Sequence, residues 1–197
     1  MHGKVDWSVG RFELKRQFFK LVGSNFRVFD PSGRLGLFSH QHGFRLKEDI
    51  RIYSDESKSH EVLSIRARQI FDFAAAYDVV DTATGQKVGA LKRKGWKSIL
   101  RDEWIVLGPD DAEVATVIED SALLAFLRRF ATNLIPQNYD MVLRQGGERV
   151  ADYKQHFNPF VYWLTMDFTM DPASRLDPRL KVAAGILLAA VEGRQEG

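Results

Sequence analysis

Five cations lie within ten residues near the middle of the sequence, and one tryptophan lies among them. This basic run contains no acid and comprises Lys92, Arg93, Lys94, Trp96, Lys97 and Arg101. Its chemistry suits a membrane interface, because amines can meet anionic headgroups while an indole lies at the boundary of the acyl chains. The alternative interpretation is a hairpin turn with solvated charges and Trp96 packed in the core. We therefore take the basic run as the candidate lipid-headgroup site, with both interpretations open.

The spacing inside the basic run makes a geometric prediction. Alternate residues of a strand share one face, so Lys92 should point with Lys94, and Lys97 with Arg101. Exposed and converging side chains would fit a headgroup site. Ion pairs with nearby acids would fit the hairpin-turn interpretation instead, because neutralised amines have little left for phosphate.

Acidic and histidine side chains form no metal-binding pattern. Asp167, Asp171 and Asp177 are weak calcium candidates, since their spacing lacks the alternating oxygen donors, central glycine and closing glutamate of an EF-hand loop. We interpret them as turn formers, N-caps and solubilising charges. His40 and His42 would share one face of a strand, but no third ligand lies in register with them. We expect no metal and no cofactor.

No motif of enzyme chemistry is present. The sequence has no GxSxG, HExxH, GxxxxGK[ST] or GxGxxG pattern. It also has no cysteine, which excludes disulfides, thiolate catalysis and iron–sulfur clusters. We predict no catalytic residue and a non-catalytic protein.

Charge and hydropathy restrict the partners. With 28 Lys+Arg against 26 Asp+Glu the formal charge is +2, so no global field would draw the chain to nucleic acid, and we do not expect a nucleic-acid partner. The N-terminus has no apolar signal region, and the apolar run VAAGILLAAV falls far short of the roughly 20 residues that cross a bilayer. We expect a cytoplasmic protein without a transmembrane segment. Any attachment to a membrane should be peripheral.

Turn residues between β-rich runs recur along the chain. Four hairpins are predicted from RVFD-PSG-RLGLF, YDVVD-TATG-QKVGAL, WIVLG-PDDA-EVATV and YDMVLR-QGG-ERVADY. About twelve short strands are expected between Phe18 and Phe168, which favours an antiparallel barrel or sandwich. We assign residues 1–17 to an N-terminal extension and residues 18–197 to a single domain.

Two segments predict helices. In residues 120–134 leucines and phenylalanines form one stripe beside Arg128 and Arg129. This stripe could lie on a membrane with its arginines toward phosphate, or it could cover one end of a barrel. These arginines are our secondary lipid candidates.

The second helix is expected at about residues 178–192, with Asp177 as N-cap and Pro178 at its first position. It is apolar on every face from Val182 through Val191, so it should be buried on every face. In a chain of strands, a closed barrel is the structure that can surround it, and Ala184, Ile186, Leu187, Leu188 and Val191 should be buried.

These features resemble one superfamily. YDVVDTATGQKVGALKRKGWKSILRDEW and LIPQNYDM are similar to segments of scramblase-related proteins, and DFTMDPASRLDPRLKVAAGILLAAVEG resembles the scramblase C-terminus, an acidic loop followed by L-D-x-x-x-K and an apolar helix. A barrel around one hydrophobic C-terminal helix is similar to the tubby C-terminal-like superfold of phospholipid scramblases, tubby proteins and plant LURP-one-related proteins. The resemblance extends from about Phe18 to Gly193. The proline-rich arm and palmitoylated cysteines of true scramblases are absent, so calcium-triggered scrambling is not implied.

The resemblance implies a fold and a class of function. The fold is a closed barrel of about twelve antiparallel strands enclosing the C-terminal helix. The function is non-catalytic, peripheral binding of anionic phospholipid or phosphoinositide headgroups. The alternative is a cytosolic protein-interaction or regulatory module without lipid affinity, and a link to transcription is one form that such a module could take.

Overall fold

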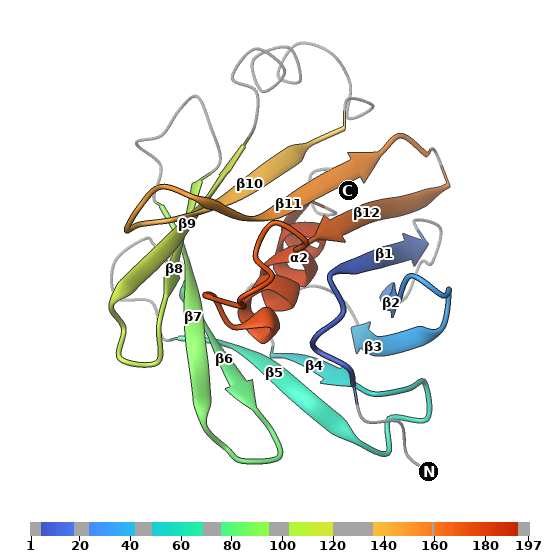
Figure 1. Cartoon of the computed structure of the whole chain (residues 1–197). Helices are drawn as coiled ribbons and strands as arrows, with labels where there is room; N and C mark the ends of the chain where they lie inside the picture. The colour runs from blue at the N-terminus through green and yellow to red at the C-terminus, as the bar shows by residue number, and fades with distance from the viewer. Residues whose placement is uncertain are drawn as a thin grey trace.

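Twelve antiparallel strands close into a barrel around one helix (Figure 1). The computed structural model describes residues 5–17, 24–41, 49–68, 76–94, 103–119, 136–158 and 160–192. The strands are β1 (Arg11–Gln17), β2 (Ser24–Phe29), β3 (Leu35–Gln41), β4 (Ile50–Tyr53), β5 (Glu61–Ala67), β6 (Ala76–Asp81), β7 (Lys87–Arg93), β8 (Glu103–Leu107), β9 (Glu113–Glu119), β10 (Asn138–Leu143), β11 (Arg149–His156) and β12 (Val161–Asp167). Each pairs with its sequence neighbours, and β1 closes the ring by pairing with β12. The predicted fold class is confirmed.

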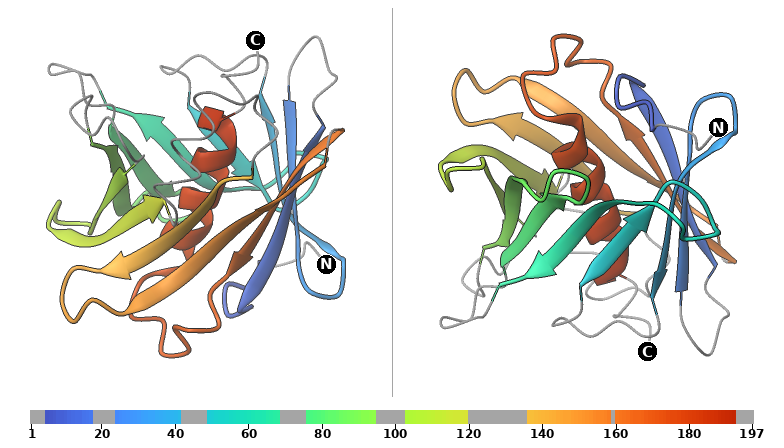
Figure 2. Two further views of the ribbon diagram at one scale, coloured as in Figure 1. Left: turned by 90° about the horizontal axis from the view of Figure 1, so that it is seen from above. Right: turned by 90° about the horizontal axis from the view of Figure 1, so that it is seen from below.

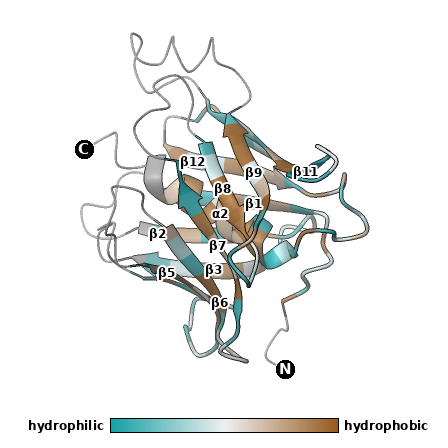
Figure 3. Cartoon of the chain, turned by 90° about the vertical axis from the view of Figure 1, so that its left-hand side faces the viewer, coloured by the Kyte–Doolittle hydropathy of each residue, from teal (hydrophilic) through white to brown (hydrophobic). Residues whose placement is uncertain are grey.

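The strands alternate between a buried and a more exposed face. β12 shows this pattern along its whole length, because Tyr162, Leu164 and Met166 are buried and the residues between them are not. Hydrophobic and hydrophilic residues accordingly alternate along the ribbons (Figure 3). The period of two places the apolar half of each strand inside the barrel and the polar half outside.

All four predicted hairpins form. Their strand pairs are β2–β3, β6–β7, β8–β9 and β10–β11. In the first, Asp30 Oδ1 accepts hydrogen bonds from the backbone N–H groups of Ser32 and Arg34 at 2.9 and 3.0 Å. Gly33 in that turn has φ 79°, a conformation that glycine adopts without strain.

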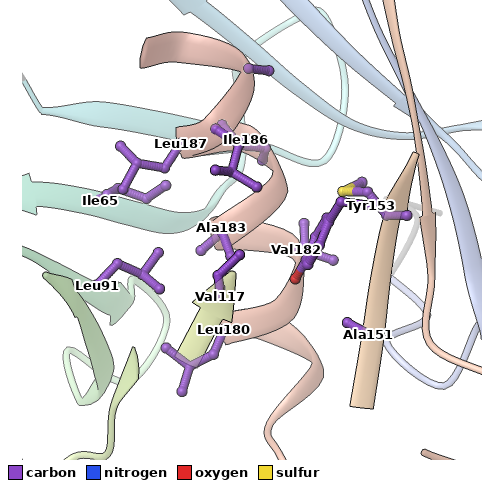
Figure 4. Close-up of a cluster of buried hydrophobic side chains, with 14 of the residues drawn as sticks. Ile65, Leu91, Val117, Ala151, Tyr153, Leu180, Val182, Ala183, Ile186 and Leu187 are labelled. Atoms are coloured by element: carbon purple, nitrogen blue, oxygen red, sulfur yellow. The ribbon is translucent and has the colours of Figure 1, made fainter. Parts of the chain in front are cut away.

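The helix α2 (Pro178–Glu192) runs through the middle of the barrel (Figure 2). Asp177 caps it as predicted, since its Oδ1 accepts the N–H of Arg179 at 2.9 Å. Every side chain from Leu180 to Ala190 is buried, and strand residues such as Ile65, Leu91 and Tyr153 point toward it (Figure 4). The predicted burial of Ala184, Ile186, Leu187 and Leu188 is confirmed. The side chain of Val191 lies outside the described residues.

The barrel begins earlier than the sequence indicated. Residues 11–17, assigned to an extension, form β1, which pairs with both β2 and β12. Phe12 and Leu14 face the core, whereas Arg11, Glu13 and Lys15 face outward. Four charged residues in the seven-residue strand RFELKRQ hide its alternation in the sequence.

Two further findings concern helices. The one predicted at residues 120–134, with Arg128 and Arg129, lies outside the described residues. Within the described chain, no helix is long and apolar enough to span a membrane.

Candidate functional site

The two ends of the barrel are defined by the direction of α2. Every neighbouring pair of strands is antiparallel, so all odd-numbered strands end at the same end of the barrel. Arg16, near the end of β1, donates from Nη1 to the carbonyl of Ala189 in the last part of α2 at 3.2 Å. Both α2 and the odd-numbered strands therefore end there, and we call it the exit end.

The described half of the basic run lies at the exit end, where β7 ends. Lys92 on β7 and Lys94 directly after it are both exposed. Arg93 between them is partly buried, and its guanidinium lies 6.0 Å from the centre of the Trp104 ring, across the β7–β8 pair. Trp96, Lys97 and Arg101 lie outside the described residues.

The two exposed lysines of the run differ in their partners. The ammonium of Lys94 lies 2.9 and 3.0 Å from the two carboxylate oxygens of Glu103 on β8. At this position the structure favours the hairpin-turn interpretation, because the ion pair neutralises the amine. Lys92 forms no ion pair with any described residue and remains available to an anion.

Lys92 is one of three similar lysines at the exit end. Lys15 and Lys154 are also exposed, and neither forms an ion pair within the described part of the chain. Each of the three lies within the last three residues of its strand, on β1, β7 and β11 respectively. Sequence analysis missed Lys15 because its strand was assigned to an extension, and it missed Lys154 because that lysine stands alone in the sequence.

The outer wall near Lys15 carries a row of cationic and aromatic side chains. Antiparallel register places Trp163 between Lys15 and His156. The ammonium of Lys15 lies 5.1 Å from the centre of the Trp163 ring and 5.6 Å from that of Phe29. On its other side Trp163 stacks on His156 with ring centres 4.3 Å apart. Lys15 is thus held between two rings while its charge stays exposed.

One carboxylate on β1, in the next outward-facing register pair, holds this row of side chains in place. Glu13 accepts the indole N–H of Trp163 and the hydroxyl of Thr165, the latter at 2.9 and 3.0 Å. Thr165 Oγ1 in turn lies 2.7 Å from Nε2 of His156. The orientation of Trp163 on β12 is therefore fixed by a hydrogen bond to β1 and by stacking on a ring of β11.

A surface groove follows the outer face of β1. Its volume is about 420 Å³. It is lined by Arg11, Glu13, Lys15, Phe29, Asp30, Pro31 and Gly33. Its charges are balanced, because Arg11 is paired with Asp167, and Asp30 lies 2.9 Å from Arg34. Lys15 is therefore the cation that this groove leaves unpaired among the described residues.

The turn between β11 and β12 presents two phenylalanines to solvent. Phe157 is 62% exposed and Phe160 66%, and no other large hydrophobic residue is exposed in the described ranges. Oδ1 of Asn158 accepts the N–H groups of Phe160 and Val161 at 2.9 and 3.1 Å, which ties Asn158 to the start of β12. The sequence contained the signal as FNPF between two strands, but exposure could not be read from it.

The predicted calcium candidates lie at the opposite end of the barrel, and each is engaged by the protein's own cations. Asp167 pairs with Arg11, Asp171 with Lys181, and Asp177 with Arg179. Across the described ranges, no three metal-ligating side chains converge. His40 Nδ1 lies 2.5 Å from the amide oxygen of Asn25, and His42 is outside those ranges.

Burial and hydrogen bonding act in opposite directions on Asp167 and Asp171. Burial tends to raise the pKa of each carboxyl. Hydrogen bonds from Thr169 and Arg11 to Asp167 outweigh it, as do those from Lys181 and the backbone to Asp171, so that both pKa values lie below the ordinary 3.8. These carboxylates are therefore held ionised by internal partners.

Comparison with known proteins gives one family and one related fold. The family model described as LURP-one-related matches residues 35–189. An X-ray structure of a protein from Arabidopsis thaliana superimposes with a TM-score of 0.53 at 14% identity, covering 100% of both chains. At that identity the likeness shows the fold alone. No curated protein matches the sequence.

Proposed function

This chain belongs to the LURP-one-related family, and on that premise we propose that it binds anionic phospholipid surfaces peripherally, without catalysis, through the exit end of its barrel. The observation that supports this proposal is the set of exposed lysines without ion-pair partners among the described residues, namely Lys15, Lys92 and Lys154. Cations elsewhere on the barrel, such as Arg11 and Arg149, are neutralised by carboxylates. Among the described lysines without an ion-pair partner, three thus lie at the exit end, whereas Lys58 lies at the opposite end.

The expected affinity is modest. A lysine near an anionic bilayer contributes about 1 kcal/mol, so three would contribute about 3 kcal/mol, and more if the rest of the basic run and Arg128 and Arg129 take part. Such binding is reversible and is screened by salt within a Debye length of about 10 Å at 0.1 M. The proposal thus places the protein in the cytoplasm, with a fraction at membranes.

Vesicle sedimentation tests the proposal. The protein is mixed with phosphatidylcholine vesicles that contain increasing phosphatidylserine or, in a second series, a phosphoinositide. We expect the bound fraction to rise with anionic lipid and to fall at high salt. Sedimentation that is indifferent to lipid charge would favour the alternative, a protein-interaction or regulatory module without lipid affinity.

A further inference from the structure

We propose that the β11–β12 turn enters the membrane, with Phe157 and Phe160 inserted among the lipids and Lys15, Lys154 and Trp163 at the level of the headgroups. This inference rests on the proposed function, that the chain binds a phospholipid surface, and it adds an apolar insertion site. The basic run predicted only an electrostatic contact.

The first argument is exposure. Scattered small apolar residues on a surface need no explanation, but two neighbouring phenyl groups at 62% and 66% exposure are an apolar projection. The remaining large hydrophobic residues of the described chain are at least partly buried. Among the described residues, this turn is therefore the place where apolar surface is offered to a partner.

The second argument is the order of the turn. Asn158 holds the backbone of Phe160 and Val161 by two hydrogen bonds to one side-chain oxygen. Backbone that is held in this way at Phe160 and Val161 loses little conformational freedom when a neighbouring side chain becomes buried, which favours insertion.

The third argument is what surrounds the phenyl groups. Trp163 and His156 form a cross-strand pair at the base of the same hairpin, and Lys15 lies opposite Trp163 on β1. Lys154 lies two residues before His156. Tryptophan and lysine together are typical of a membrane interface, because each has an apolar body and a polar or charged tip. The phenyl groups thus lie beyond a band of side chains suited to headgroups.

The charge of this band decides between a lipid surface and a protein partner. Lys15 and Lys154 form no ion pair within the described ranges, so an anionic surface meets them without displacing a carboxylate. Each described strand has a neighbouring strand on both sides in the closed barrel, which disfavours the addition of a peptide as a further strand. A phospholipid interface therefore complements the turn in both hydrophobicity and charge.

The absence of cysteine permits a direct test. Phe157→Cys is labelled with an environment-sensitive fluorophore, and Ser57→Cys, in the exposed β4–β5 turn at the opposite end, is the matched control. With mixed phosphatidylcholine–phosphatidylserine vesicles we expect the emission of the label at residue 157 to shift to the blue and to be quenched by lipids with brominated acyl chains. The label at residue 57 should show neither effect. A label at 157 that stays in water while the protein is bound would overturn the insertion.

A double variant, Phe157→Ser with Phe160→Ser, measures the contribution of the turn. It should bind these vesicles at least about tenfold more weakly, because both phenyl groups lose their burial in lipid, and its cooperative thermal unfolding should show that the barrel still folds. Unchanged affinity overturns the insertion and leaves the charge-dependent proposal intact, which would assign the turn to a protein partner. Binding that depends on the phenyl groups but not on lipid charge overturns the anionic-surface proposal alone. Absence of binding to every vesicle overturns both.

Discussion

The ammonium of Lys181 lies 2.9 Å from Oδ2 of Asp171, and both side chains are almost completely inaccessible to water. The pair joins the second residue of the buried stretch of α2 to the loop that follows β12. Asp171 also accepts the backbone N–H groups of Arg175 and Leu176, at 3.0 and 3.2 Å. Lys181 Nζ lies 5.2 Å from the centre of the Phe168 ring. The loop and the central helix are therefore joined by one buried charge pair.

Removing one member of this pair should destabilise the barrel strongly. Asp171→Asn leaves the ammonium of Lys181 buried without a counterion and should lower the free energy of unfolding by about 3 kcal/mol or more. Lys181→Met should cost less, because Asp171 keeps its two backbone donors and Arg175. Urea unfolding of the two single variants and the double variant checks this.

The double variant provides the control. Once Lys181 is methionine, the change at Asp171 no longer leaves a buried charge unpaired. The double variant should therefore lose less unfolding free energy than the sum of the two single losses. Strictly additive losses would show that the pair contributes no coupling.

Acid should destabilise the fold within a defined pH range. Asp30 has a pKa of about 2, lowered mainly by the hydroxyl of Ser32 and also by Arg34, and the pKa of Asp171 also lies below 3.8 despite its burial. Because these folded-state values are lower than the unfolded value, the native state binds fewer protons. The stability that these two ionised carboxylates contribute is therefore present above pH 3.8 and is lost as the pH falls toward 2. Urea midpoints that stay constant over this range would contradict the prediction.

Close packing between strands makes one glycine difficult to replace. A Cβ at Gly89 on β7 would lie 2.3 Å from the backbone oxygen of Leu107 and 2.9 Å from a methyl group of Leu180. Gly89→Ala should lower the free energy of unfolding by about 1–3 kcal/mol, because the strand pair must move apart. Gly36→Ala is the matched control, since its Cβ would meet only the Val28 oxygen at 3.7 Å. Thermal melting of both variants should show a loss only in the first.

The fold could be predicted because its signals are local. Turn residues mark the hairpins, and the unbroken apolar surface of residues 182–191 requires a surrounding barrel. The strand of residues 11–17 was missed because charged outward residues outnumber its apolar ones. The buried pairing of Lys181 could not be predicted, since its partner Asp171 is ten residues away in the sequence and only the folded loop brings the two together.

The candidate site was harder to predict because its members are distant in sequence. The basic run could be found because its residues are close together in the sequence. The sequence did not show, however, that Lys94 is neutralised by Glu103 from the neighbouring strand. Lys15 and Trp163 are far apart in the sequence, and only the closure of the barrel places them side by side. A sequence motif detects charged residues that are neighbours in the sequence, whereas strand pairing brings together residues that are distant in it.

Charge reversal at the exit end is the most direct test of which cations meet the lipid. Each replacement of Lys15, Lys92 or Lys154 by glutamate removes one favourable charge and adds one repulsive charge, so each should weaken binding to anionic vesicles by about 2 kcal/mol, roughly thirtyfold. Their melting temperatures should stay close to that of the parent, because none of these lysines forms an ion pair among the described residues. Lys58→Glu is the matched control. Lys58 is also exposed and forms no ion pair within the described chain, but it lies in the β4–β5 turn at the opposite end of the barrel. Equal losses in all four variants would mean that net charge alone drives binding. Losses confined to the three exit-end lysines would show that the barrel approaches the bilayer with that end first.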